Sequence, residues 1–206
     1  MGNYQALLQS KMSSESYNKL AALHNDKVIE FIGSFVEHCE PASVYVCTDS
    51  EADIQYVRDQ ALALGEEHTL ARNKQTIHWD GYSDQGRDKK GTQFLVYKDN
   101  LESMKALNAI EYEEGLAEIM SISKGIMKGK AAVVQFFSEG PTESVFTIPC
   151  VQFTDSWYVA HSEFILYRSA YNHFLGMKDS EKGDFFRFIH SAGELDARSE
   201  EHTSEL

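Results

Sequence analysis

The sequence predicts an α/β fold. Between residues 26 and 65, an amphipathic helix is followed by a short β-branched strand and then by a second helix, an order typical of this class. Two later stretches, 131–137 and 151–171, are rich in β-branched and aromatic residues, as is typical of the middle of a core. At 206 residues, with 42% hydrophobic side chains, the chain is long enough to bury such a core.

Residues 1–25 are polar and weakly helical, and we expect them to form a poorly defined leader. Asp26 is expected to cap the first clear helix, and the alternating residues 43–47 (SVYVC) predict a strand. Ser50 is expected to begin the second helix, with Gly65 just past its end. The inward faces of these helices are predicted to hold Val28, Ile29, Ile32, Phe35, Val36 and Cys39, and Ile54, Val57, Ala61 and Leu64.

The remaining elements follow from the same periodicities. Strands are predicted at 93–97, 131–137 and 144–149, and in 185–196 before a glycine-containing turn, with a helix at 111–128. The strand at 131–137 is expected to be buried on both faces. The helix is expected to turn inward Leu116, Ile119, Met120, Ile122 and Ile126. For 157–168 the periodicity leaves strand and helix both open.

The densest apolar and aromatic run in the chain is Val151–Tyr171. Polar residues are set into it at intervals: Thr154, Asp155, Ser156, His161, Ser162, Glu163 and Arg168. Because an unpaired buried polar group costs free energy, these side chains must either satisfy one another or line a cleft. His161, and His190 further along, lie in apolar surroundings, and we interpret both as core histidines with satisfied hydrogen bonds.

Composition excludes several classes of partner. The formal net charge of −13 argues against nucleic acid or an anionic membrane surface. No apolar run is long enough to span a bilayer, and the N-terminus lacks the pattern of a signal peptide, so we expect a cytoplasmic protein. The cysteines Cys39, Cys47 and Cys150 are odd in number and far apart, which favours reduced, buried thiols.

Few segments have the spacing of a known catalytic motif. The stretch from Gly125 to Ala131 (GIMKGKA) superficially resembles a phosphate-binding loop, but it has one residue too few between its glycines and no hydroxyl after the lysine. We interpret it as the C-terminal cap of a helix. Histidine and cysteine spacings do not fit a zinc site, and no G-x-S-x-G segment is present.

Arg87 is the candidate substrate-binding residue. It lies in the aperiodic stretch 66–92, between two aspartates and just before Lys89 and Lys90. A long polar stretch inside a compact domain is usually functional or disordered, and its aromatic residues favour order. A loop arginine is often only a surface charge, but a guanidinium is also the side chain best suited to bidentate binding of carboxylate or phosphate.

Two separated motifs resemble the GTP-dependent phosphoenolpyruvate carboxykinases, and most closely the archaeal and bacterial branch. The family's V-Q-L-T-D-S-x-Y-V segment corresponds to residues 151–159 (VQFTDSWYV), and its H-S-x-G turn to residues 190–193 (HSAG). The segments EGLAEIMSISKGIMKGK and DGYSDQGRD are also similar to that branch. The resemblance covers roughly residues 25–197, and it implies a mixed sheet flanked by helices, the amino-terminal lobe of this fold.

The resemblance also implies a reaction. These carboxy-lyases interconvert oxaloacetate and GTP with phosphoenolpyruvate, GDP and carbon dioxide in gluconeogenesis. They use Mn2+ at the active site and Mg2+ or Mn2+ with the nucleotide. By motif position, Arg87 is expected to bind the substrate's carboxylate or phosphate. Asp88 and Lys89 depart from the eukaryotic members, which have a hydrophobic and then an acidic residue there, so no role is carried over to them.

The family's metal ligands, Y-G-G-N segment, phosphate-binding loop and guanine pocket lie beyond the H-S-x-G turn and have no counterpart in this sequence. We therefore expect residues 1–197 to be an amino-terminal lobe that binds no metal or nucleotide and is inactive alone. Residues 198–206 (RSEEHTSEL) match a translated sequencing adapter, and we expect them to lie outside the natural fold. The alternative is a non-catalytic binding module for small anionic metabolites.

Overall fold

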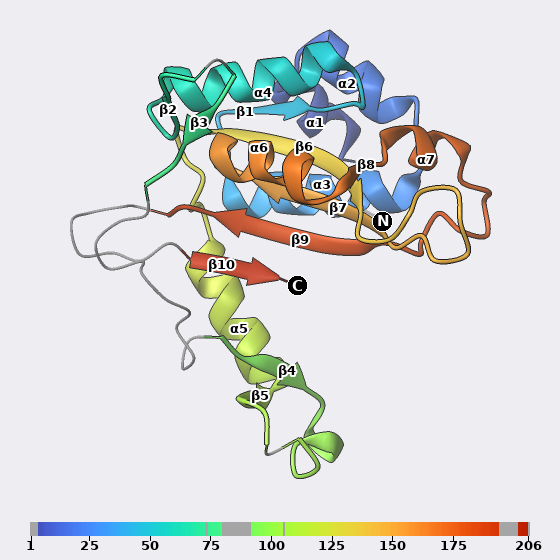
Figure 1. The fold of residues 1–206 in the computed structure, drawn as a ribbon. Helices are drawn as coiled ribbons and strands as arrows, with labels where there is room; N and C mark the ends of the chain where they lie inside the picture. Colours follow the sequence, from blue (N-terminus) through green and yellow to red (C-terminus); the bar gives the residue numbers. More distant parts are fainter. Residues whose placement is uncertain (1–3, 73, 80–91, 105, 194–201, 206) are drawn as a thin grey trace.

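The computed structural model describes residues 4–72, 74–79, 92–104 and 106–193, together with the backbone of 202–205. Within these residues the predicted α/β class is confirmed, because a mixed six-stranded sheet lies between helices (Figure 1). Its strands are β1 (Ser43–Val46), β6 (Ala131–Ser138), β7 (Pro149–Thr154), β8 (Arg168–Ser169), β9 (Phe186–Ser191) and β10 (His202–Glu205). The helices are α1 (Gln5–Lys11), α2 (Ser14–Ala21), α3 (Asp26–Cys39), α4 (Glu51–Ala63), α5 (Tyr112–Ser123), α6 (Trp157–Leu166) and α7 (Tyr171–Gly176).

Strand direction decides which residues meet at the edge of the sheet. The order is β1-β6-β7-β9-β10, and β8 pairs with the far end of β6. β7 runs parallel to β9 and antiparallel to β6. The carboxyl ends of β7 and β9 therefore lie beside the beginning of β6, at one edge of the sheet.

The two faces of the sheet carry separate parts of the core. The first face packs against α1, α2, α3 and α7, through alternate strand residues such as Val134 and Phe153. The second face packs against α4 and α6, with Val57, Val133 and Trp157 at its centre. Because both faces are covered, β6 is buried almost throughout, as predicted.

Residues 4–25 form two helices, although the polarity of the first 25 residues predicted a poorly defined leader. Helices α1 and α2 pack on the first face of the sheet, where Leu8 and Leu20 are buried. Tyr4 lies directly against Gly33 of α3, so the missing side chain of that glycine makes room for the N-terminal segment. The expectation was wrong because a few apolar residues, widely spaced in sequence, suffice to bury two short helices.

Several element boundaries also differ from the sequence prediction. Residues 144–148 form a turn rather than a strand, because the Thr147 hydroxyl donates to the Ser144 carbonyl and accepts from the Ser144 N–H. Asn25, not Asp26, caps α3. The open question at 157–168 is resolved as a helix, α6, followed by β8.

Helix α5 ends at Ser123, earlier than predicted, and Gly125–Gly129 is a turn rather than the helix cap itself. The Gly125 N–H and the Met127 N–H donate to the last carbonyls of α3.

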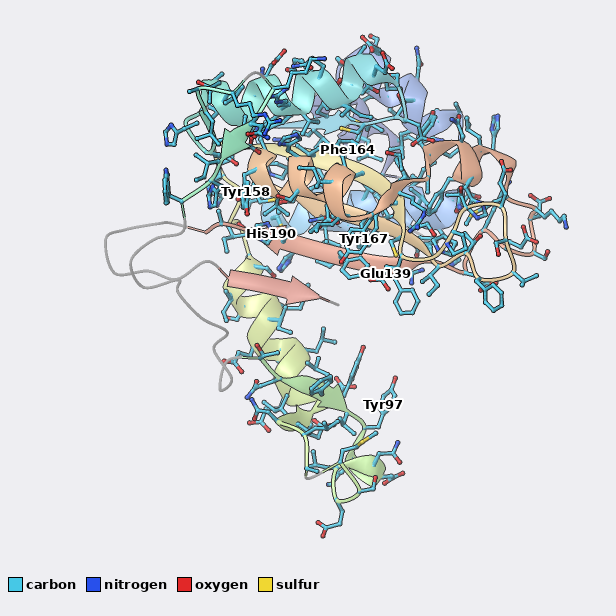
Figure 2. All side chains as sticks on the ribbon, viewed as in Figure 1. Tyr97, Glu139, Tyr158, Phe164, Tyr167 and His190 are labelled. Atoms are coloured by element: carbon cyan, nitrogen blue, oxygen red, sulfur yellow. The ribbon has the colours of Figure 1, made fainter. Side chains whose placement is uncertain are left out.

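Helix α5 belongs to an arm that projects from the main sheet (Figure 1). The arm also holds β4 (Phe94–Val96), the 3-10 helix η1 (Lys98–Asn100) and β5 (Ala109–Glu111), with β4 and β5 paired in parallel. Ile122 was predicted to face inward but is 49% exposed, since the arm has little core to cover it. Tyr97, labelled in Figure 2, stacks on Tyr112 with ring centroids 5.0 Å apart.

The short strand β10 lies within the segment expected to be adapter-derived. Its backbone pairs antiparallel with β9, so β10 is the outermost strand on that side of the sheet.

Candidate functional site

The predicted substrate residue Arg87 lies outside the described residues, as do Lys89 and Lys90. What the structure describes is the chain on both sides, which ends at Trp79 and resumes at Thr92. The candidate site therefore comprises the residues at the carboxyl ends of β7 and β9 and the segment 66–79, which precedes Arg87 in the sequence.

Three neighbouring strands bring a lysine, an aspartate and a serine together at this edge. Lys130 immediately precedes β6, Asp155 immediately follows β7, and Ser191 ends β9. Lys130 Nζ lies 3.1 Å from Asp155 Oδ2, and the same oxygen accepts a 2.7 Å hydrogen bond from Ser191 Oγ. The Asp155 side chain is fully buried, so its contacts with these partners replace the water molecules that the carboxylate loses on folding.

The H-S-x-G turn closes over this pair. The Ala192 N–H donates to Asp155 Oδ1 at 2.9 Å, and Lys130 Nζ donates to the Gly193 carbonyl at 2.5 Å. Gly193 has a φ of 63°, a left-handed conformation that favours glycine. The two motifs recognised in the sequence therefore meet in space, with Asp155 of one holding the backbone of the other.

His190 is held at the same edge. It is the register partner of Thr154, and its Nδ1 lies 2.8 Å from Thr154 Oγ1. Burial lowers the pKa of His190 to about 4, which leaves the ring neutral at neutral pH. The structure thus confirms a buried histidine with a hydrogen-bond partner. Figure 2 shows His190 and Tyr158 at the end of the sheet where β9 finishes and α6 begins.

Two adjacent glutamates attach the segment after α4 to the beginning of α6. Glu66 Oε2 accepts a 3.0 Å hydrogen bond from Ser156 Oγ and a 2.8 Å hydrogen bond from the Tyr158 N–H. Glu67 Oε1 lies 2.6 Å from Nδ1 of His161. Burial raises the pKa of Glu66, and the hydrogen bonds from α6 offset part of that effect.

The far end of the same segment returns to α6. Residues 66–79 contain a two-stranded ribbon, β2 (His68–Thr69) and β3 (Thr76–Ile77). His78 stacks on Tyr158 with ring centroids 3.6 Å apart and an interplanar angle of 10°. Its Nδ1 donates to the Glu66 carbonyl at 2.6 Å. Both ends of residues 66–79 therefore contact the first turns of α6.

Comparison with known proteins identifies the family of this chain. Residues 30–205 match the family described as phosphoenolpyruvate carboxykinase N-terminal domain. The chain belongs to the phosphoenolpyruvate carboxykinase family. The resemblance at residues 151–159 and 190–193 is thereby confirmed, together with the fold class that it implied.

Its relatives include archaeal proteins named phosphoenolpyruvate carboxykinase [GTP]. The chain is 49% identical over 191 residues to the protein of Pyrococcus horikoshii and 48% identical to that of Pyrococcus abyssi. It is 39% identical to the protein of Saccharolobus solfataricus. In each case the match covers 93% of this chain and 30% of the relative. The chain is thus homologous to the amino-terminal part of these carboxykinases and spans under a third of their length.

The described residues do not provide a metal site. They contain no group of three or more His, Cys, Asp or Glu side chains that could hold a metal ion. Over the same residues, no helix has the length and apolar character needed to cross a bilayer.

The cysteines are free and buried, as predicted. Burial raises the pKa of Cys39 and of Cys150 to about 12, so both are protonated at neutral pH. These thiols are part of the core rather than of the site.

Sequence reasoning identified the motifs at this edge but missed the glutamates and Lys130. Lys130 was considered only as part of a false phosphate-binding loop, and Glu66 and Glu67 opened an aperiodic stretch. The local pattern has no signal for these residues, because their partners lie more than 20 positions away.

Proposed function

We propose that this chain forms the amino-terminal part of a GTP-dependent phosphoenolpyruvate carboxykinase. Such a carboxy-lyase interconverts oxaloacetate and GTP with phosphoenolpyruvate, GDP and carbon dioxide. The observation that carries the proposal is the 46–49% identity, over 93% of the chain, to three relatives that bear this name. A cytoplasmic location and a role in gluconeogenesis are proposed on the same ground.

Arg87 is proposed to bind the carboxylate or phosphate of the substrate. A planar guanidinium offers two parallel donors to either group, and it stays charged at any physiological pH. The placement of the adjoining segment supports this role, because residues 66–79 are attached beside the carboxyl ends of β7 and β9. Ligands commonly bind beyond the carboxyl ends of strands in α/β proteins.

The metal ions and the nucleotide are proposed to bind outside this chain. The reaction needs positive charge around a developing enolate and a transferring phosphoryl group, which Mn2+ and a nucleotide-bound Mg2+ or Mn2+ supply when bound. The described residues offer no metal-binding group. We therefore assign those sites to the part of the relatives that the match does not cover, and expect the 206-residue chain alone to be inactive.

A hybrid enzyme tests the proposal. Residues 4–193 would replace the matching segment of the Pyrococcus horikoshii carboxykinase, and GTP-dependent decarboxylation of oxaloacetate would be measured. We expect an active hybrid, and an increase of roughly a hundredfold in KM for the substrate on Arg87→Ala, because a bidentate charged contact is lost.

The matched control is Arg168→Ala, which removes an exposed arginine beside the opposite end of β6. A folded but inactive hybrid would contradict the carboxykinase assignment, and equal effects of the two substitutions would contradict the role of Arg87. Calorimetry on the 206-residue chain tests the alternative function. Tight binding of phosphoenolpyruvate or oxalate, abolished by Arg87→Ala, would favour a stand-alone binding module.

A further inference from the structure

The second face of the sheet is left open at β9. Helix α6 lies over β6 and β7, and Figure 1 shows none of the drawn helices in front of β9. On this face of β9, His190 is buried, Phe188 is half-buried and Phe186 is 62% exposed. On the first face, the neighbouring Ile189 is buried in the core. Because a sheet normally buries both faces against other layers, β9 lacks one covering layer within the described residues.

The open part of β9 joins an apolar surface that continues onto the end of α6. Tyr167 stacks on Phe137 with ring centroids 4.9 Å apart, and the Phe137 centroid lies 5.5 Å from that of Phe188. Figure 2 shows Tyr167 where the end of α6 meets β9. Leu166, which precedes Tyr167, is 69% exposed. The rings thus connect the exposed end of α6 to the open face of β9.

The turn before β7 extends this surface on the other side of Phe186. Ile148 and Phe186 line one open pocket of about 440 Å³. Phe146, two residues earlier, is 73% exposed. A contiguous exposed apolar surface is typical of an interface rather than of scattered surface residues. We call it the apolar β9 surface, and it comprises Phe146, Ile148, Leu166, Phe186 and Phe188.

The border of the apolar β9 surface is mainly acidic. Burial raises the pKa of Cys150 to about 12, and the carboxylates of Glu139 and Glu163 add to this effect, so both lie near the register partner of Phe186. Asp184 lines the pocket beside Phe186, and the exposed Arg168 offsets only part of this negative charge.

These charges decide between two kinds of partner. Two copies of a chain with a formal net charge of −13 would bring like charges together at this border, which disfavours a second copy. A partner with an apolar centre and a basic border fits the surface better.

The carboxykinase relatives contain a candidate for this partner. The match covers 30% of each relative, so more than two thirds of each lies outside it. The matched part is amino-terminal, and β9 lies near its end. The sequence that follows in the relatives therefore begins close to the open face of β9.

We propose that the apolar β9 surface docks the carboxy-terminal part of the carboxykinase, through an apolar segment bordered by basic residues. This inference rests on the proposed function, since it takes the chain to be the amino-terminal part of such an enzyme. The docked segment supplies the layer that the second face lacks at β9. It also buries Phe186 and Leu166, whose exposure is unfavourable in water.

Thiol labelling tests the docking without any activity. Phe186→Cys places a thiol on the surface, and peptide mass spectrometry follows its reaction with a maleimide in the 206-residue chain and in the hybrid enzyme. We expect labelling to be roughly tenfold slower in the hybrid, because the carboxy-terminal part covers the site.

The control for labelling is Leu64→Cys, at the C-cap of α4, where the leucine is 61% exposed. It should label at equal rates in the two proteins. Equal rates for Phe186→Cys, or equal slowing at both positions, would overturn the proposal.

Charge substitutions test the chemistry of the contact. Phe186→Asp should lower the melting temperature of the hybrid and leave that of the 206-residue chain unchanged, because the side chain is already exposed there. Glu139→Lys, which reverses one charge of the border, should act in the same direction to a smaller extent. Leu64→Asp is the matched control and should change neither protein. A hybrid that keeps its melting temperature with Phe186→Asp would contradict an apolar contact at this surface.

Sedimentation of the 206-residue chain tests the other occupant. We expect a monomer at the concentration used for labelling. A dimer that Phe186→Asp dissociates would mean that a second copy covers the surface, and the proposal would be wrong. A hybrid that folds but has no activity contradicts the proposed function, whereas labelling still decides whether the surface is covered.

Discussion

Lys130 and Asp155 form an ion pair across the ends of two neighbouring strands, with Nζ and Oδ2 3.1 Å apart. The aspartate side chain is fully buried, whereas the lysine is 37% exposed. The pair also fixes the turn after β9, because Asp155 accepts from Ser191 and Ala192.

Lys130→Met should destabilise the fold. It leaves a buried carboxylate without its cation, so we expect the free energy of unfolding to fall by about 2 kcal/mol, less than the 3–5 kcal/mol typical of a fully buried pair because Lys130 is partly hydrated. Urea denaturation measures the change. The double variant Lys130→Met, Asp155→Asn should lose less than the sum of the single losses, and strict additivity would contradict the coupling.

His190 should make the fold sensitive to acid. Its pKa is about 4 in the folded chain and 6.5 when unperturbed, so the unfolded chain binds more protons between these values. The neutral His190 ring makes its full contribution to the free energy of unfolding above pH 6.5. This contribution is lost as the pH falls through about 4, and the loss is at most roughly 3 kcal/mol. Denaturation at several pH values should show a shallower acid loss for His190→Gln than for the wild-type chain. The exposed His68→Gln should keep the wild-type slope.

Gly33→Ala should be destabilising, although alanine is ordinarily the better helix former. A β-carbon at this position would lie 2.3 Å from Cγ of Tyr4, so the N-terminal segment would have to move. We expect thermal unfolding to show that the free energy of unfolding falls by about 1–2 kcal/mol, whereas helix propensity alone would raise it by about 1 kcal/mol. Adding Tyr4→Ala should make the Gly33→Ala step neutral or favourable. If it does not, the contact is not the cause.

Glu66→Gln should stabilise the chain at neutral pH while it keeps the hydrogen bonds to α6. Burial raises the pKa of Glu66, so ionising this group opposes folding as the pH rises through its folded-state pKa. The variant should therefore melt at a higher temperature than the wild-type chain at pH 7, and at the same temperature where Glu66 is protonated in both states. A lower melting temperature at pH 7 would mean that the charge itself holds the segment.

Removal of residues 198–206 should change stability little. The four-residue strand β10 pairs with β9 only at the outer edge of the sheet, and a short edge strand adds few buried contacts. Thermal unfolding of chains ending at residues 197 and 206 measures the effect. A large loss on truncation would contradict the interpretation of this segment as adapter-derived and outside the natural fold.

The main helices and strands were predictable because their signals are local. The apolar spacing of Val28, Ile32 and Val36 specifies one buried face of α3, and the apolar run 131–137 specifies a strand covered on both sides. Boundaries were less predictable where side chains bond to nearby backbone, as Thr147 does in the turn before β7. The N-terminal helices were missed because their burial depends on Gly33 and the sheet rather than on a strong pattern of their own.

The sequence by itself determined the fold class and the family, whereas its assignment of Arg87 as the substrate-binding residue stays a prediction. Only the tertiary structure decided that Asp155 holds the H-S-x-G turn through Lys130 and Ser191, and that Glu66 and Glu67 attach residues 66–79 to the beginning of α6. Periodicity reports which residues share a face within one element. Partners separated by 25 to 94 positions meet only because strand register and helix packing bring their elements together.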